Sequence, residues 1–103
     1  MMAKVITADE FAAMDNSKSI LIDFYAEWCG PCQQLGPILD EVSGEVDVPI
    51  YKINVDDPSS KKLAMQNKVM SIPTMVMFKN GEATATTGFL GKDDLIKFIN
   101  NNK

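Results

Sequence analysis

The sequence contains no histidine and no arginine, and it has only two cysteines, Cys29 and Cys32. The lack of histidine excludes a Cys–His nucleophile pair of the protease kind. A structural zinc site takes four Cys or His ligands, so this composition argues against zinc within one chain, although a metal shared between two chains stays open. Two interpretations of the pair remain, a redox-active dithiol and an inert buried pair, and we favour the first.

Long apolar segments are also lacking. The longest runs, residues 20–26 and 75–78, are far too short to cross a bilayer. Residues 1–7 have neither the apolar core nor the small-residue cleavage site of a secretory signal. We therefore expect a cytoplasmic protein without a membrane partner. In a reducing compartment, a single cysteine pair is more often redox-active than a permanent structural disulfide.

Positive charge is scarce as well. The net charge is −4, and all ten basic residues are lysines. An acidic chain without a basic patch is a poor candidate for binding nucleic acid or anionic membranes. The length of 103 residues is that of one compact domain, which needs no structural disulfide or metal to fold. The composition, with 46% hydrophobic and 23% charged residues, is ordinary for a globular protein. We expect a single domain over residues 1–103 and a monomer.

Strand and helix patterns alternate along the chain. Thr7 and Glu10 have the spacing of a helix capping box, and Asn80-Gly81 is a strong hairpin signal. The segment 20–26 is apolar on both alternating faces, which is typical of a central strand covered on both sides. The predicted elements are a strand at 5–6, a helix from Thr7 to about Met14 that is broken at 16–18, a strand at 20–26, a helix from the cysteines to Gly44, a strand at 50–55, a helix near 60–67, strands at 74–78 and 83–87, and a helix at 92–101.

This order, β-α-β-α-β-α-β-β-α, predicts an α/β fold. Alternating strands and helices form parallel pairs with right-handed crossovers, and the hairpin adds an antiparallel part. The two cysteines follow the central strand directly, at the start of the helix after it.

Cys29 and Cys32 are three residues apart, so on the first turn of a helix their Cβ atoms lie about 5–6 Å apart. A disulfide can therefore form with little backbone movement. The free N–H groups and partial positive charge of the helix N-terminus favour a thiolate. We expect Cys29, at the tip, to be accessible and to attack a target disulfide. Cys32, one turn in, is expected to be more buried and to resolve the mixed disulfide.

Gly30 and Pro31 separate the two cysteines. Gly30 leaves room for the backbone of another protein, and Pro31 suits the first helical turn because it has no N–H that would be left unpaired. Neither residue carries a positive charge that would stabilise the thiolate further. This points to a reductant rather than an oxidant.

The segment Asp23-Phe24-Tyr25-Ala26-Glu27-Trp28-Cys29-Gly30-Pro31-Cys32 closely resembles the active-site segment of the thioredoxin family. The resemblance continues through Pro37-Ile38-Leu39, Asn54-Val55-Asp56, Ile72-Pro73-Thr74, Phe78-Lys79-Asn80-Gly81 and Gly88. It implies the thioredoxin fold, with a central mixed five-stranded sheet flanked by four helices. It also implies a general protein-disulfide reductase whose redox group is its own reversible Cys29–Cys32 disulfide. A thioredoxin reductase drawing on NADPH would regenerate the dithiol, and no bound cofactor or metal is expected.

Asp23 lies in the middle of an apolar strand, where a carboxylate is expensive to bury. It either finds a hydrogen bond near the end of the sheet or acts as an acid of raised pKa that takes and returns the proton of Cys32. We favour the acid, because perturbed buried carboxyls cluster at active sites. The resemblance assigns this role to the matching Asp and implies that Lys52 lies nearby.

Pro73 alone would be an ordinary proline at a strand start. The resemblance implies instead a cis Ile72–Pro73 bond that faces the cysteines and leaves the backbone of Ile72 free to pair with an extended substrate. Trp28 is interpreted as an exposed docking residue rather than as packing, with Gly88 and Phe89 completing the groove. Together with Gly30 and Pro31, these residues form the predicted substrate-binding surface.

Some residues differ from the commonest family pattern and affect docking preferences rather than redox chemistry: Gln33 in place of a basic residue, Tyr25 in place of Trp, and Met70-Ser71 beside the proline loop. The methionines Met65, Met70, Met75 and Met77 are expected to pack in the core and at its rim rather than to bind a soft metal.

Two alternative functions remain at this point. One is an oxidase or isomerase that uses the same cysteine pair, which the missing cation and missing signal peptide disfavour. The other is a binding module in which redox activity is incidental.

Overall fold

The computed structural model describes residues 3–15 and 17–103. Its elements are β1 (Lys4–Val5), α1 (Ala8–Ala13), β2 (Ile20–Tyr25), α2 (Gly30–Ser43), β3 (Ile50–Asn54), the 3₁₀ turn η1 (Pro58–Ser60), α3 (Lys61–Gln66), β4 (Thr74–Lys79), β5 (Glu82–Thr87) and α4 (Lys92–Asn102). The predicted element order is confirmed, with η1 as a short addition. The expectations for Met1, Met2 and Asn16 lie outside the described residues.

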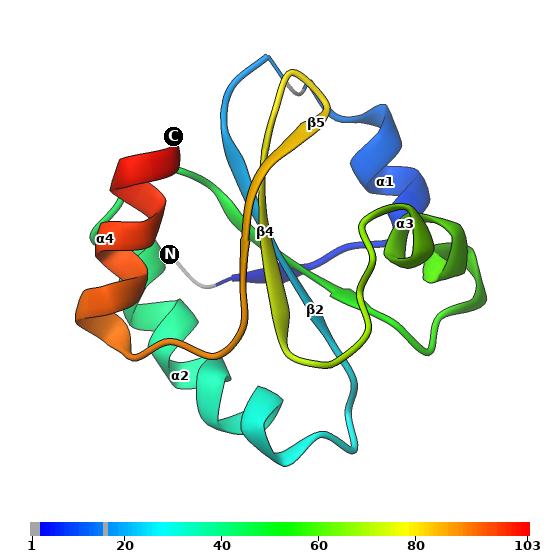
Figure 1. Cartoon of the computed structure of the whole chain (residues 1–103), viewed down its shortest axis with the longest axis horizontal. Helices are drawn as coiled ribbons and strands as arrows, with labels where there is room; N and C mark the ends of the chain where they lie inside the picture. The colour runs from blue at the N-terminus through cyan, green and yellow to red at the C-terminus, as the bar shows by residue number, and fades with distance from the viewer. Residues whose placement is uncertain (1–2, 16) are drawn as a thin grey trace.

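The strands form a five-stranded sheet in the order β1-β3-β2-β4-β5 (Figure 1). The pairs β1–β3 and β2–β3 are parallel, and the pairs β2–β4 and β4–β5 are antiparallel. The predicted mixed sheet is therefore confirmed. All six residues of β2 are buried, as expected for a central strand.

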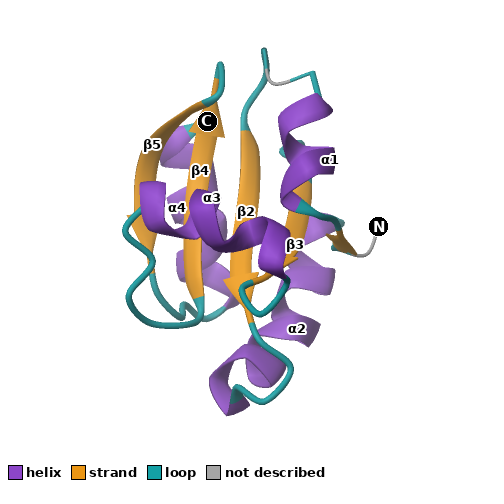
Figure 2. Ribbon diagram, turned by 90° about the vertical axis from the view of Figure 1, so that its right-hand side faces the viewer, coloured by secondary structure: helices purple, strands orange, loops and turns teal. Residues whose placement is uncertain are grey.

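Helices cover both faces of this sheet, with α2 and α4 on one side and α1 and α3 on the other (Figures 1 and 2). The first core, which α2 and α4 cover, contains Leu21, Leu39, Met77 and Ile99. The second core contains the residues of β2 that alternate with Leu21, namely Ile20, Ile22 and Phe24, together with Phe11 of α1. The two apolar faces that the sequence predicts for β2 thus enter two different cores.

Local signals in the sequence also produce the structures expected of them. The side-chain oxygen of Thr7 accepts a hydrogen bond from the backbone N–H of Glu10, and the Glu10 carboxylate accepts one from the Thr7 N–H, each at 3.0 Å. In the hairpin, Asn80 and Gly81 have φ angles of 55° and 78°. Two successive residues of positive φ match the turn that joins twisted antiparallel strands.

Some expectations differ from the structure. The β1 strand begins one residue earlier than predicted, although Ile6 still donates a hydrogen bond to the Lys52 carbonyl. Met75 and Met77 are fully buried as expected, but Met65 and Met70 are 74% and 92% exposed, so core or rim packing was wrong for these two. In the described part of the chain, no helix is long and apolar enough to cross a membrane.

Candidate active site

The two cysteines lie where β2 passes into α2. Cys29 is the N-cap residue of α2, and its Sγ accepts a hydrogen bond from the Cys32 N–H at 3.2 Å. Their Cα atoms are 5.2 Å apart, and the sulfurs form a disulfide. This Cα distance is within the range that disulfides require. The structure therefore represents the oxidised form, built on the first turn of a helix as the spacing predicted.

Both sulfur-bearing residues are buried. Cys29 is 4% exposed and Cys32 is 2% exposed, so the prediction of an accessible Cys29 was wrong for this oxidised form. The reason is the loop before β4, because Ile72 packs against the cysteine cluster and its carbonyl oxygen lies 3.7 Å from Cys29 Sγ. Ile72, which covers Cys29, is 43 residues away from it in the sequence.

The Ile72–Pro73 peptide bond is cis, as the resemblance implied. The loop is tied to itself by the Thr74 hydroxyl, which donates a hydrogen bond to the Ser71 carbonyl. Gly88, which follows β5, lies beside this loop, and a Cβ atom added there would be 3.8 Å from the Pro73 carbonyl oxygen. The structure thus brings Ile72, Pro73 and Gly88 together near the disulfide.

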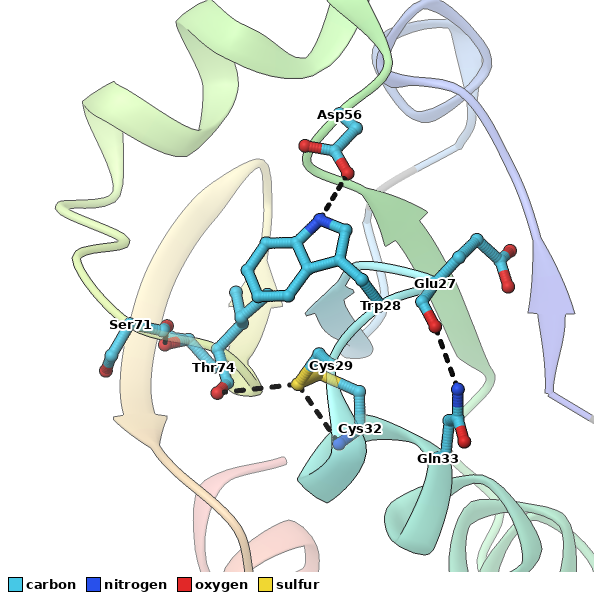
Figure 3. The surroundings of a disulfide bond; sticks show 9 residues. Glu27, Trp28, Cys29, Cys32, Gln33, Asp56, Ser71 and Thr74 are labelled. Atoms are coloured by element: carbon cyan, nitrogen blue, oxygen red, sulfur yellow. Dashed lines mark hydrogen bonds between the residues drawn. A yellow bond between two sulfur atoms is a disulfide. The ribbon is translucent and has the colours of Figure 1, made fainter.

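Trp28 is 71% exposed, as expected for a docking residue. Its indole N–H donates a hydrogen bond to Asp56 Oδ2 at 2.8 Å (Figure 3). On the other side of the disulfide, the Gln33 side-chain amide donates one to the Glu27 carbonyl at 2.8 Å (Figure 3). Sequence reasoning gave no role to Asp56, although this residue belongs to a motif of the resemblance. The signal that could have found it is its place just after β3, at the same edge of the sheet as the cysteines.

A cavity of about 360 Å³ lies beside Trp28. Its lining comes from the loop between β2 and α2, from the residue that follows β3, from α3 and from the loop before Pro73: Trp28, Val55, Ala64, Val69, Met70, Ser71 and Ile72. Gly88 and Phe89 do not line it, although Phe89 is 43% exposed. The predicted substrate surface therefore has a concave apolar part on the α3 side of Ile72, which the sequence did not indicate.

Asp23 is fully buried, and neither of its carboxylate oxygens has a hydrogen-bond partner within the described residues. The alternative in which Asp23 merely finds a hydrogen bond is thus not what the structure contains. Burial raises the pKa of Asp23 from 3.8 to about 7, and the nearby charge of Lys52 opposes part of that rise. Because Asp23 pairs in register with Met75, a member of the core under α2, its side chain points to the α2 face.

Lys52 is the register partner of Asp23 on β3, so the two residues are neighbours as the resemblance implied. The Lys52 ammonium lies 4.4 Å from the centroid of the Tyr25 ring. Within residues 3–15 and 17–103, Lys52 forms no ion pair with Asp23.

The same described ranges contain no group of three His, Cys, Asp or Glu side chains arranged to hold a metal ion. The chemistry that this arrangement supports is thiol–disulfide exchange with a titratable carboxyl nearby.

Comparisons with known proteins agree with this geometry. The family model described as Thioredoxin matches residues 2–101. Among curated relatives, thioredoxin of Chlamydia caviae is 45% identical over 101 residues, covering 96% of this chain and 97% of the relative. Thioredoxin of Rickettsia bellii is 38% identical over 106 residues, covering 98% and 99%.

Solved structures give the same result. The crystal structure of Malassezia sympodialis thioredoxin superposes with a TM-score of 0.82 at 32% identity, covering 97% of this chain and 90% of that one. A mutant thioredoxin from Halobacterium salinarum superposes with a TM-score of 0.83 at 31% identity, covering 97% and 88%.

Proposed function

This chain belongs to the thioredoxin family of thiol–disulfide oxidoreductases, and from that premise we propose that it is a general protein-disulfide reductase in which Cys29 attacks and Cys32 resolves. The observation that carries the assignment of roles is the N-cap geometry of Cys29. Its Sγ accepts a hydrogen bond from the Cys32 N–H at the positive end of α2, an arrangement that stabilises a thiolate.

The proposed reaction has two exchange steps. The Cys29 thiolate attacks one sulfur of the target disulfide, and the other target sulfur leaves as a thiolate. The Cys32 thiol then loses its proton and attacks Cys29 Sγ, so that the second target sulfur leaves and the Cys29–Cys32 disulfide forms. The target gains two electrons and the cysteine pair loses two. A thioredoxin reductase drawing on NADPH is the proposed source of electrons for the next cycle.

Asp23 is proposed to take the proton of Cys32 and to return it. It is suited to this because a carboxyl with a pKa of about 7 is present in both protonation states near neutral pH. Its side chain is on the sheet face that α2 covers, and α2 carries Cys32. Lys52 is proposed to assist by placing a positive charge beside the carboxyl.

Substrate binding is proposed to use the surface around the disulfide. Trp28 offers an exposed aromatic ring, and exposed Gly30 and Pro31 leave the tip of α2 uncrowded. The Ile72–Pro73 loop, with Gly88 and Phe89 beyond it, would pair with an extended segment of the client. Since Cys29 is only 4% exposed, a client must approach along this loop to reach the sulfur.

The remaining proposals concern context. We propose that residues 1–103 form one domain that works as a monomer, with disulfide-containing proteins as clients and with no nucleic-acid or membrane partner. A reductant of this kind needs a reducing compartment, and the cytoplasm is the proposed one.

The roles of the cysteines can be tested by trapping. Cys32→Ser and Cys29→Ser are incubated with an oxidised protein client, and mixed disulfides are counted on non-reducing gels. Cys32→Ser should accumulate a mixed disulfide through Cys29, because the resolving step is blocked, and Cys29→Ser should accumulate none. The reverse result would invert the roles. Failure of the wild-type protein to reduce any client would favour a binding module instead.

A further inference from the structure

Asp23, Tyr25 and Lys52 form a cluster on the face of the sheet that α2 covers. Asp23 and Tyr25 are two residues apart on β2, so their side chains point to the same face. Lys52 is the register partner of Asp23 on the parallel neighbour β3 and shares that face. The three side chains are therefore neighbours, and each can affect the other two.

The position of the Lys52 ammonium within this cluster is unexpected. A buried carboxylate is strongly stabilised by an available cation, yet neither oxygen of Asp23 has a hydrogen-bond partner in the described part of the protein. The ammonium instead lies 4.4 Å from the centroid of the Tyr25 ring, within the range of a cation–π interaction. A lysine side chain is long and flexible, so its position is set by whatever holds its charged end.

The Tyr25 ring is held from several sides. Its side chain is 6% exposed and packs in the same cluster as Cys29 and Cys32. Its hydroxyl donates a hydrogen bond to Glu27 Oε1 at 3.5 Å. Burial, followed by the charge of Glu27, raises the pKa of Tyr25, so the hydroxyl keeps its proton and remains a donor. The ring thus provides a fixed apolar face for the ammonium.

We infer that Tyr25 is a positioning residue, whose ring holds the Lys52 ammonium beside Asp23 but out of contact with it, and so sets how strongly this cation acts on the buried carboxyl. The inference deepens the proposed function, because it rests on a proton-exchanging role for Asp23. A closed Lys52–Asp23 ion pair would keep Asp23 ionised at neutral pH. Complete removal of the ammonium would keep Asp23 protonated to higher pH. With the ammonium held against the ring, the titration midpoint of Asp23 should lie between those of these two cases.

The groups that face Asp23 come from each element packed against it. Lys52 of β3 is the charged group that acts on the Asp23 carboxyl. From its own strand β2, Asp23 meets the Tyr25 phenol, whose pKa it helps to raise. Its register partner on β4 is the apolar Met75, and α2 contributes the sulfur of Cys32 to the cluster around Tyr25. A change at Tyr25 can therefore reach Asp23 by freeing Lys52 or by altering the burial of the carboxyl, and the test must separate these routes.

The test is the titration of the Asp23 carboxyl carbon, followed by NMR in the oxidised protein. Tyr25→Phe keeps the ring and removes only the hydroxyl, so its midpoint should match the wild type. Tyr25→Leu removes the ring and frees the ammonium to approach the carboxylate, which should lower the midpoint by about one pH unit or more. Lys52→Met should raise the midpoint. Tyr25→Met serves in place of Tyr25→Leu if the latter does not fold.

The double variant Tyr25→Leu/Lys52→Met separates the two routes. If the ring acts by holding Lys52, its removal should no longer lower the midpoint once Lys52 is gone. The inference is overturned if Tyr25→Leu leaves the midpoint unchanged or raises it, or if it lowers the midpoint equally with and without Lys52. The pH profile of client reduction for Asp23→Asn is measured in parallel. An unchanged profile there would remove the proton-exchanging role of Asp23, whereas the effect of Tyr25 on the titration would stand by itself.

Discussion

The interior between the sheet and the helices α2 and α4 has two parts of different character. In the apolar part, Leu21 and Leu39 are fully buried among other hydrophobic side chains. In the redox part, Asp23 is equally inaccessible, but its carboxylate oxygens have no hydrogen-bond partner within the described residues. Leu21 and Asp23 are only two residues apart on the same strand and the same face.

The contrast shows where the protein gives up stability for chemistry. A buried Leu contributes to folding at every pH, because it has no charge to desolvate. Burial raises the pKa of Asp23 from 3.8 to about 7, so ionised Asp23 opposes folding. A difference of this size corresponds to ~4 kcal/mol of folding free energy at alkaline pH. The apolar part must supply that free energy.

The largest expected effect is the loss of a side chain from the apolar part. Leu39→Ala should lower the free energy of unfolding by about 2–5 kcal/mol, because the fully buried site loses transfer free energy and leaves a cavity. Ile38→Ala, on the same helix but half-buried, should cost less. Urea denaturation measures both. Ile38 packs against the same core, so equal losses at the two positions would mean that complete burial does not decide the size of the loss.

The second effect has the opposite sign and depends on pH. Between pH 3.8 and about 7 the folded state binds more protons at Asp23 than the unfolded state, so wild-type stability falls as the pH rises through this window. Asp23→Asn removes the ionisation, so it should be more stable than the wild type by up to ~4 kcal/mol at pH 8 and about equal to it at pH 4. Asp93→Asn, which removes an exposed carboxyl in α4, is the matched control for the loss of one acidic side chain. A stability difference independent of pH would contradict the account of Asp23.

The smallest effect on stability is expected outside the buried parts, at the docking surface. Trp28→Ala should change the free energy of unfolding by about 1 kcal/mol or less, because the side chain is 71% exposed and loses one exposed hydrogen bond. Its kcat/KM for a folded protein disulfide should fall by about tenfold, equivalent to the loss of one aromatic anchor of ~1–2 kcal/mol. Reduction of a small aromatic disulfide should change much less.

Met65→Ala is the control for Trp28→Ala, because Met65 is similarly exposed at 74% but does not line the cavity beside Trp28. It should leave both the stability and the client reduction near wild type. A similar loss of client reduction in both variants would mean that docking is not localised to the cavity.

The fold could be predicted from the sequence because its signals are local. The capping box of Thr7 and Glu10, the apolar faces of β2 and the positive-φ turn at Asn80-Gly81 each depend on residues close together in the chain. The cysteine pair is of the same kind, since its spacing and its place at a helix start define its geometry.

What the sequence could not predict depends on contacts between distant segments. Cys29 is covered by Ile72, which approaches only when β4 pairs with β2. The hydrogen bond of Trp28 to Asp56, and the place of Lys52 over Tyr25, need β3 in its register beside β2. Met70 lines the cavity beside Trp28 and is 92% exposed, which its apolar side chain alone does not indicate.

The central claim is that the Cys29–Cys32 pair is a reductant, and its equilibrium redox potential tests this most directly. The wild-type protein is equilibrated in defined dithiol buffers, and the fraction of oxidised pair is measured by thiol alkylation and mass. We predict a potential at or below the cytosolic glutathione poise, roughly −220 to −260 mV by extraction methods. A potential well above that range would contradict the account and place the protein among oxidases or isomerases.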